Sequence, residues 1–232
     1  FGVRYILAVP RSGRGVAAGA GDKAASNFTF DVTLKDGTGA NGAKFDGNML
    51  DNVADGQVGH EKYGTDGVIG DYGWAVLNPD TGNVEIVQYG DLNTAAGQQT
   101  LLDALNKYLK ATYGVNSDGE QLVEATGVTM GGRSVTFTVR EGADLSIPMK
   151  IHVGAIDDRI TENRETFEVQ VSNIKAEDKG QGQNVIIDDK NKASTDILDD
   201  HGKDSRDGFL VALDNNSGIE SDKFVKLPVL LF

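Results

Sequence analysis

The sequence of 232 residues contains no cysteine, only three histidines and one tryptophan. Without cysteine the chain has no disulfides, no thiolate zinc site and no cysteine nucleophile. The histidines, His60, His152 and His201, are far apart in the sequence, which disfavours a histidine-based metal site or catalytic triad. If a metal ion stabilises the fold, we therefore expect oxygen ligands.

Positive charge is also scarce. The 22 Lys and Arg residues are outnumbered by 35 Asp and Glu residues, which gives a formal net charge of −13. Such a charge disfavours binding to nucleic acids and to anionic membranes. No apolar run approaches the roughly 18 residues that a membrane-spanning helix requires. We therefore expect no nucleic-acid partner and no membrane insertion.

The remaining composition is that of a folded, loop-rich protein. Hydrophobic residues make up 39% of the chain and 30 residues are glycine, so the chain can bury a core. Asp outnumbers Glu by 25 to 10, and Asp favours turns and hard-cation sites over helices. Because the chain begins at Phe1 without a signal-peptide pattern, we expect a processed protein or a piece of a longer one.

Alternation of apolar and polar residues predicts a mainly β fold. Residues 72–77 and 83–89 flank a turn at 78–82 that contains Pro and Gly, so they predict a hairpin. The other segments with alternating or β-branched residues are 28–34, 135–139, 147–153 and 166–171.

One segment predicts a helix. In residues 98–113, apolar side chains recur at helical spacing, and Gly114 follows as a C-terminal cap. Two polar stretches interrupt the strands: residues 39–70 predict a long irregular excursion, and residues 175–192 predict either a solvated loop or a hairpin arm around residues 185–187.

Both ends of the chain are apolar. Residues 3–9 predict a strand, and residues 224–232 are apolar apart from Lys226 and include Pro228. An apolar end of this kind requires a partner, because an exposed one promotes aggregation. It is either an edge strand of its own sheet or a strand donated to a neighbouring copy or domain. The candidate assembly residues are Phe224, Val225, Leu227, Val229, Leu230, Leu231 and Phe232.

Acidic residues cluster where two predicted strands meet their loops. If seven carboxylates converged at one end of a β-sandwich, they would repel one another unless cations neutralised them. Calcium suits such a site, since it accepts six to eight oxygen ligands in irregular geometry. The alternative is a solvated acidic loop. The candidate ligands are Asp157, Asp158, Glu162, Glu165, Asp196, Asp199 and Asp200.

These residues also carry a family resemblance. The run AIDDRITENRETFEVQVSN at 155–173, followed by ASTDILDD at 193–200, resembles the Calx-β module found in giant bacterial RTX-type adhesins. FTFDVTLKDGTGANGAKFDG at 28–47 is similar to an early strand and acidic loop of that module. The likeness covers residues 26–50 and 127–200.

The resemblance implies a fold and a function. It implies an immunoglobulin-like antiparallel sandwich over residues 1–200, with calcium at one end and Asp46 as a further ligand. It also implies a non-enzymatic module in an extracellular or cell-surface adhesin. Because the family has a short connection where this chain has residues 47–126, we expect an inserted subdomain with one helix there. Residues 201–232 would form a C-terminal extension.

The expected insertion offers two further candidate sites. Asp66 and Asp71 lie in a glycine-rich stretch, where backbone carbonyls can turn inward beside carboxylates, so they form a candidate second calcium site. Four aromatic residues offer a stacking platform for a glycan or peptide, with membership of the core as the alternative. They are Tyr63, Tyr72, Trp74 and Tyr89.

Catalytic motifs are missing from the sequence. No serine lies in a nucleophile elbow, and no aromatic residues of a sugar-binding cleft surround the acidic pair Asp157 and Glu162. We therefore expect a calcium-stabilised adhesin module without enzymatic activity. The alternatives are a filament subunit assembled by exchange of the apolar terminal strands, and a glycan- or peptide-binding domain that acts through the insertion.

Overall fold

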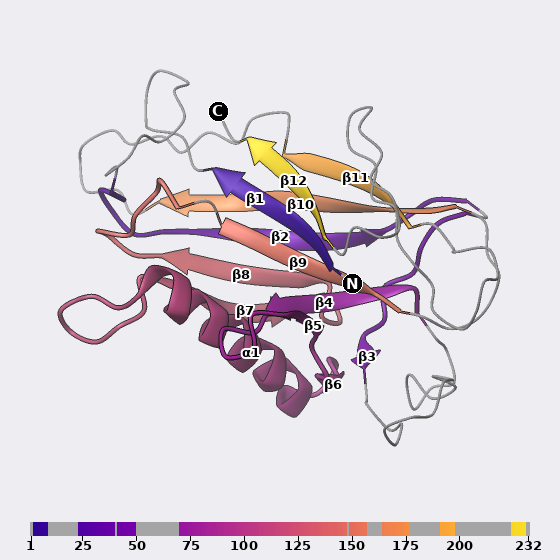
Figure 1. Ribbon diagram of the computed structural model, residues 1–232, viewed down its shortest axis with the longest axis horizontal. Coiled ribbons are helices and arrows are strands. Elements are labelled where there is room, and N and C mark those ends of the chain that lie inside the picture. Colours follow the sequence, from indigo (N-terminus) through magenta and orange to yellow (C-terminus); the bar gives the residue numbers. More distant parts are fainter. Residues whose placement is uncertain are drawn as a thin grey trace.

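The computed structural model describes residues 2–8, 23–39, 41–49, 70–147, 149–156, 164–176, 191–197 and 224–230. Their strands form two five-stranded sheets and one two-stranded ribbon (Figure 1). The first sheet, in the order β12-β1-β9-β4-β5, contains Phe224–Leu230, Gly2–Ala8, Met149–Ala155, Tyr72–Leu77 and Val84–Ile86. The second sheet, in the order β11-β10-β2-β8-β7, contains Lys192–Ile197, Glu165–Ala176, Phe28–Asp36, Ser134–Val139 and Val123–Thr129. The ribbon pairs β3 (Asn48–Met49) with β6 (Gly90–Asp91).

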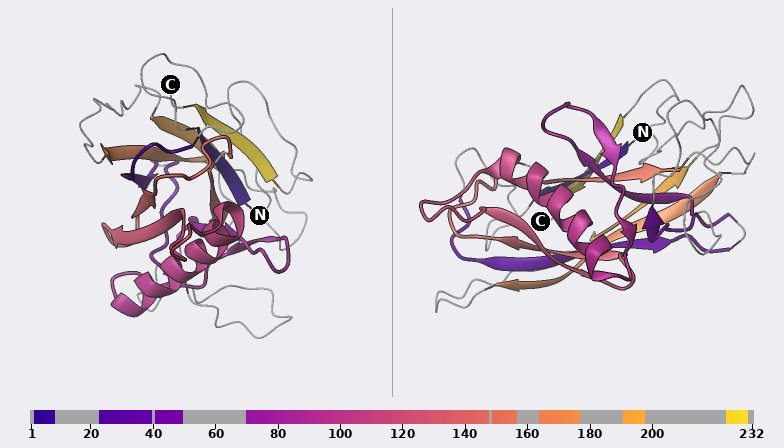
Figure 2. Two further views of the ribbon diagram at one scale, coloured as in Figure 1. Left: turned by 90° about the vertical axis from the view of Figure 1, so that its left-hand side faces the viewer. Right: turned by 90° about the horizontal axis from the view of Figure 1, so that it is seen from below.

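The two large sheets pack face to face, and their inner faces form the core (Figure 2). In β2, Phe30, Val32 and Leu34 alternate with polar residues and are at most 2% exposed, as a half-buried strand requires. The ring of Tyr72 in the first sheet stacks on Phe167 in the second, with centroids 4.3 Å apart. The prediction of a mainly β chain is therefore confirmed, and the arrangement is that expected of a β-sandwich.

One helix, α1 (Ala95–Tyr113), lies along the open side between the sheets (Figure 2). It begins three residues before the predicted segment, because Thr94 accepts a hydrogen bond from the Gly97 N–H at 3.1 Å and caps the first turn. Gly114 ends the helix at a φ of 76°, where glycine is favoured. The Asn106 side chain bonds both the N–H and the C=O of Ala125 in β7. The helix thus closes one side of the sandwich.

Part of the expected insertion belongs to the sheets. Strand β4 pairs with both β5 and β9, which confirms the predicted hairpin and makes it integral to the first sheet. Strand β7 pairs with β8 at the edge of the second sheet. Among the described residues of 47–126, β3, β6, α1 and their connections do not belong to either large sheet. Residues 50–69 lie outside the described part of the chain.

The two terminal strands pair with each other. Strand β12 lies parallel to β1 at the edge of the first sheet, with Pro228 opposite Ile6. An edge position accommodates proline, which lacks the N–H needed between two strands. Within this chain, residues 224–230 therefore form the edge strand that was one of the two alternatives. Leu231, Phe232 and the arm around residues 185–187 lie outside the described residues.

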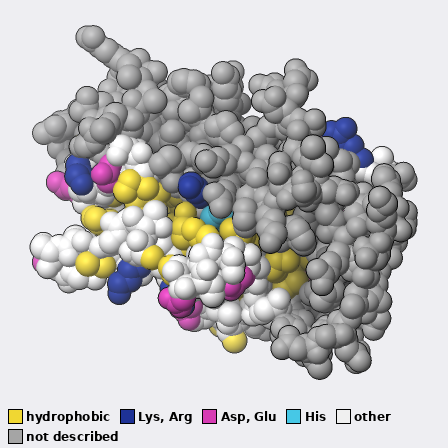
Figure 3. Space-filling view, viewed as in Figure 1, with side chains coloured by type: hydrophobic (Ala, Val, Ile, Leu, Met, Phe, Trp, Pro, Cys, Tyr) yellow, Lys and Arg dark blue, Asp and Glu magenta, His cyan; other side chains and the backbone are white. Residues whose placement is uncertain are grey.

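On the face shown in Figure 3, several hydrophobic side chains of the described residues lie next to one another, and Lys, Arg, Asp and Glu side chains lie around them. Among the described residues, the large hydrophobic side chains counted as exposed are Val115, Met130 and Ile147. Isolated exposed apolar residues of this kind are ordinary on a folded protein.

Candidate functional site

Five described carboxylates lie at one end of the sandwich, which we refer to as the acidic end. Strand pairing places Asp36 opposite Phe167 and Asp196 opposite Thr166. The segment 41–46 crosses this end, because the Ala43 N–H donates to the Thr166 carbonyl at 2.9 Å and the Asp46 N–H to the Tyr72 carbonyl at 2.8 Å. The acidic end is made of Asp36, Asp46, Asp71, Glu165 and Asp196.

Asp36 is the centre of a polar network. Arg133 donates to both of its carboxylate oxygens, with 2.9 Å between Nη2 and Oδ2. The Phe45 N–H and the Tyr72 hydroxyl also donate to Oδ1, at 2.8 and 3.3 Å. The guanidinium carbon of Arg133 lies 5.3 Å from the centroid of the Phe45 ring, within cation–π range. This network ties the strand ends of the second sheet to the segment that follows β2.

The network also fixes the charges at Asp36 and its partners. Burial raises the pKa of Asp36. The hydrogen bonds from Arg133 and Phe45 and the positive charges of Arg133 and Lys44 lower this pKa by more than burial raises it. The net pKa therefore lies below its usual value of about 3.9, and the carboxylate stays ionised at neutral pH. Burial and the nearby charge of Asp36 raise the pKa of Tyr72, so its hydroxyl remains a donor.

Asp46 and Asp71 order the backbone of the same end. Asp46 is 5% exposed, and its two oxygens accept from the N–H groups of Asn48 at 2.8 Å and Gly70 at 3.2 Å. Asp71 accepts from the Lys44 N–H at 2.5 Å and donates its own N–H to the Lys44 carbonyl at 2.7 Å. Both carboxylates therefore accept hydrogen bonds from backbone N–H groups of this end that have no partner in a strand.

Glu165 and Asp196 project to opposite faces of the second sheet. Glu165 pairs with Ile197 and shares its face with Phe167, which is 2% exposed and belongs to the core. Asp196 pairs with Thr166 on the outer face and forms an ion pair with Arg164. The sequence predicts the two acids as one group of ligands. The pleat of β10 and β11 instead separates them into an inner-face acid and an outer-face acid.

The other predicted ligands lie outside the described residues, but their neighbours are placed. Ile156, which precedes the first acidic stretch, donates its N–H to the Asp71 carbonyl at 3.0 Å. Arg164 ends that stretch, and Ile197 precedes the second. All three lie at the acidic end. The predicted ligands beyond the described residues are Asp66, Asp157, Asp158, Glu162, Asp199 and Asp200.

No metal-binding cluster is complete within the described residues. They contain no group of three or more His, Cys, Asp or Glu side chains arranged to hold an ion. Asp36 and Arg133 were not predicted as a pair, because they are 97 positions apart in the sequence and belong to different strand ends. The position of Asp36, just after the alternating residues 28–34, was the one feature of the sequence that could have identified it.

The three described residues of the predicted aromatic platform are buried. Tyr72 and Trp74 are 0% exposed and Tyr89 is 2% exposed, so their rings present no face to a glycan or peptide. The Trp74 Nε1–H donates to the Gly132 carbonyl at 2.6 Å, and the Tyr89 hydroxyl donates to the Asp46 carbonyl. The platform prediction is wrong for these residues, whereas the alternative of core membership fits them. Tyr63 lies outside the described residues.

Comparison with known proteins found no match among family models, curated protein sequences or solved structures. In the described part of the chain, α1 is the one helix, and it does not combine the length and the apolarity that crossing a membrane requires.

Proposed function

We propose that this chain is a calcium-stabilised, non-enzymatic module of a bacterial extracellular adhesin, with an immunoglobulin-like sandwich of Calx-β type. One observation carries the proposal. Ile156, Arg164 and Ile197, which border the two acidic stretches, lie at the same end of a two-sheet β-sandwich. In the sequence, Ile156 and Arg164 flank residues 157–163 and Ile197 precedes residues 198–200, and these two stretches contain five of the proposed ligands.

The two-faced arrangement of the acidic end sharpens the ligand set. Asp196 is already paired with Arg164, and its side chain is 14% exposed. The inner-face acid Glu165 lies three residues after Glu162 in the sequence, close to the stretch that also contains Asp157 and Asp158. We therefore assign the first stretch and Glu165 as the principal calcium ligands. Carboxylates of this number match the oxygen-rich coordination that calcium requires.

Calcium would act on stability because it binds the folded chain and not the unfolded one. At a concentration 100 times its Kd, this linkage adds about 2.7 kcal/mol to the free energy of unfolding. For a chain of this size, we expect the melting temperature to rise by about 5–10 °C. The test is thermal unfolding of chelated protein with and without millimolar Ca²⁺, with Mg²⁺ as the control. An equal response to both ions, or to neither, would overturn the proposal.

Matched variants test the assignment. Asp157→Asn and Glu165→Gln remove one charge each with little change in shape, so each should lower calcium affinity and shrink the calcium-dependent rise in melting temperature. Asp118→Asn removes an exposed acid from the turn between α1 and β7 and should leave that rise unchanged. If all three variants respond alike, calcium recognises the general negative charge and not this site.

A second candidate function, a filament subunit assembled by strand exchange, is favoured by the pairing of β1 with β12. Both are terminal strands, and β12 has one neighbour at the sheet edge in the described structure. The same pairing between two copies would link them. Light scattering over a range of concentrations should then show oligomers that disappear when residues 224–232 are deleted. A full-length protein that stays monomeric at every concentration would exclude this function.

A further inference from the structure

One buried hydroxyl group in the second sheet has no hydrogen-bond partner among the described residues. It belongs to Thr195, which lies in the edge strand β11 and is 1% exposed. The Thr195 Oγ1 neither donates nor accepts a hydrogen bond there. A buried hydroxyl without a partner costs free energy, because the group has lost its water and gained nothing in return. A bound ion is one of the partners that such a group takes in folded proteins.

The strand register places this hydroxyl on the inner face of the sheet, at the acidic end. Phe167 in β10 lies opposite Thr195 in β11 and opposite Asp36 in β2. Because directly paired residues share a face, all three lie on the face that forms the core. Glu165 belongs to the same face, two residues before Phe167 along β10. At the acidic end, the inner face of the second sheet therefore carries two acids and a hydroxyl group.

Thr195 and Glu165 occupy diagonal positions on this inner face, because Glu165 pairs with Ile197, two residues after Thr195. Diagonal neighbours on antiparallel strands have Cα atoms about 7–8 Å apart, a span that a long side chain can cross. The inner-face residues on either side of Thr195 in β11 are Ala193 and Ile197, which pack against the core. Thr195 is thus the inner-face residue of β11 whose side chain can offer an oxygen to a ligand of Glu165.

We propose that the Thr195 hydroxyl is a neutral ligand of the calcium ion that Glu165 binds. The inference rests on the calcium site proposed above and adds a residue to it. Calcium takes six to eight oxygen ligands and combines carboxylates with neutral oxygens. The threonine oxygen has two lone pairs, so it can coordinate a cation without adding to the mutual repulsion of the carboxylates. Asp36 is not assigned to the ion, because its carboxylate is already paired with Arg133.

The test is Thr195→Val, which removes the hydroxyl and keeps the shape of the side chain. In chelated protein, the melting temperature of the variant should equal or exceed that of the wild type, since the lost hydroxyl has no partner among the described residues. Its Kd for Ca²⁺, measured by isothermal titration calorimetry, should rise about tenfold or more, a loss that even an outer-shell partner of a metal can cause. In saturating Ca²⁺ the wild type should therefore be the more stable protein.

Two matched variants separate a metal ligand from a structural hydroxyl. Thr195→Ser keeps the hydroxyl, so its Kd for Ca²⁺ should stay close to that of the wild type. Thr33→Val removes a hydroxyl from β2 that is also buried but is hydrogen-bonded to the Ser134 hydroxyl at 2.9 Å. This variant should lower the melting temperature of chelated protein by about 2–4 °C and leave the Kd unchanged. The two valine variants should therefore have opposite effects: one weakens calcium binding, and the other lowers stability without calcium.

The outcomes distinguish this inference from the proposed function. If the wild type binds Ca²⁺ and Thr195→Val binds it with the same Kd, the calcium site stands but Thr195 is not one of its ligands. If Thr195→Ser weakens binding as much as Thr195→Val does, packing at position 195 and not the hydroxyl affects the ion, which also overturns the inference. If the wild type binds no Ca²⁺, the inference and the proposed function both fail. Weaker binding by Thr195→Val, with Thr195→Ser and Thr33→Val unchanged, supports both.

Discussion

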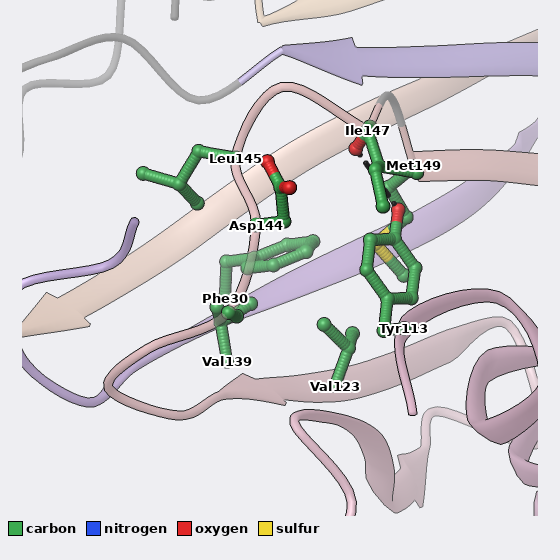
Figure 4. Close-up of a pocket in the computed structure, with 9 residues that line it drawn as sticks. Phe30, Tyr113, Val123, Val139, Asp144, Leu145, Ile147 and Met149 are labelled. Atoms are coloured by element: carbon green, nitrogen blue, oxygen red, sulfur yellow. Dashed lines mark hydrogen bonds between the residues drawn. The ribbon is translucent and has the colours of Figure 1, made fainter. Parts of the chain in front are cut away.

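The two ends of the sandwich are closed by different chemistry. At the acidic end, carboxylates accept hydrogen bonds from backbone N–H groups and from Arg133, as Asp36 and Asp46 illustrate. At the opposite end, which we refer to as the apolar end, buried side chains such as Phe30 and Met149 lie between the sheets. One hydrogen bond there, from the Tyr113 hydroxyl to the Ile147 carbonyl, ties the last residue of α1 to the loop between β8 and β9 (Figure 4). Helix α1 joins the two ends, because the Leu92 N–H, just before the helix, donates to the Gly47 carbonyl at 2.8 Å.

Because of this difference, we expect the two ends to tolerate substitutions unequally. A buried polar group must keep its partner, since an unsatisfied donor or acceptor costs about 1–3 kcal/mol. Apolar contacts tolerate changes of shape more readily when total volume is kept. Small polar substitutions should therefore damage the acidic end more than the apolar end, and the experiments below test that contrast.

The largest effect should come from Trp74, which joins the core to the turn at the acidic end. Trp74→Ala removes a side chain that is 0% exposed and should lower the free energy of unfolding by about 3–5 kcal/mol. Trp74→Phe keeps most of the apolar contact but leaves the Gly132 carbonyl without its donor, and should lower it by about 1–3 kcal/mol. Urea denaturation followed by circular dichroism measures both, since the sole Trp is lost.

Tyr113→Phe is the matched control at the apolar end. It also removes a single donor to a backbone carbonyl, but this bond is exposed to water, which can replace the donor. We expect a loss below about 1 kcal/mol. A loss as large as that of Trp74→Phe would show that the two ends do not differ in the way described.

The next effect should come from Asp36 and should depend on pH. Because the pKa of Asp36 is lowered in the folded state, its contribution to stability is complete above its unfolded pKa of about 3.9 and is lost as the pH falls through the lower folded value. Asp36→Asn should lower the free energy of unfolding by about 2 kcal/mol at pH 7, because it leaves Arg133 half-buried without its charged partner. Denaturation at pH 7, 5 and 3 measures this loss.

The pH series also provides the check on Asp36. The wild type and Asp36→Asn should converge toward pH 3, where the wild-type carboxylate begins to take up a proton. A difference that stays constant from pH 7 to well below pH 3 would mean that the variant acts through packing and not through charge.

Local patterns in the sequence predicted several elements but not strand β7, and the predicted strand at 83–89 is shorter in the structure, where β5 covers Val84–Ile86. The alternation of Phe30, Val32 and Leu34 identified the inner face of β2, and the Pro and Gly of residues 78–82 identified the β4–β5 hairpin. Helical spacing and Gly114 identified α1. Each of these signals acts over a few residues, because a strand, a turn or a helix is determined largely by its own side chains and caps.

Long-range pairing was beyond such signals. Trp74 and Gly132 are 58 positions apart. No pattern in the sequence near Trp74 predicts that its indole N–H donates to the turn between β7 and β8, or that β4 belongs to the core. Glu165 and Asp196 illustrate the same limit, since only the register of β10 against β11 reveals that they face opposite ways. The acidic residues at the ends of the two predicted strands therefore indicated a common end of the sandwich but not a common set of ligands to one ion.

The smallest effect should be a gain in stability at the turn between β7 and β8. Met130 has a φ of 55° and a side chain that is 67% exposed, so a long residue holds a left-handed conformation without burial to compensate. Met130→Asn should raise the free energy of unfolding by about 0.5 kcal/mol, because asparagine adopts this conformation more readily. Met130→Ala is the control, since it removes the exposed thioether without that preference. If alanine stabilises as much as asparagine, the gain comes from the loss of an exposed apolar side chain. The left-handed backbone at position 130 would then not be what destabilises this turn at the acidic end.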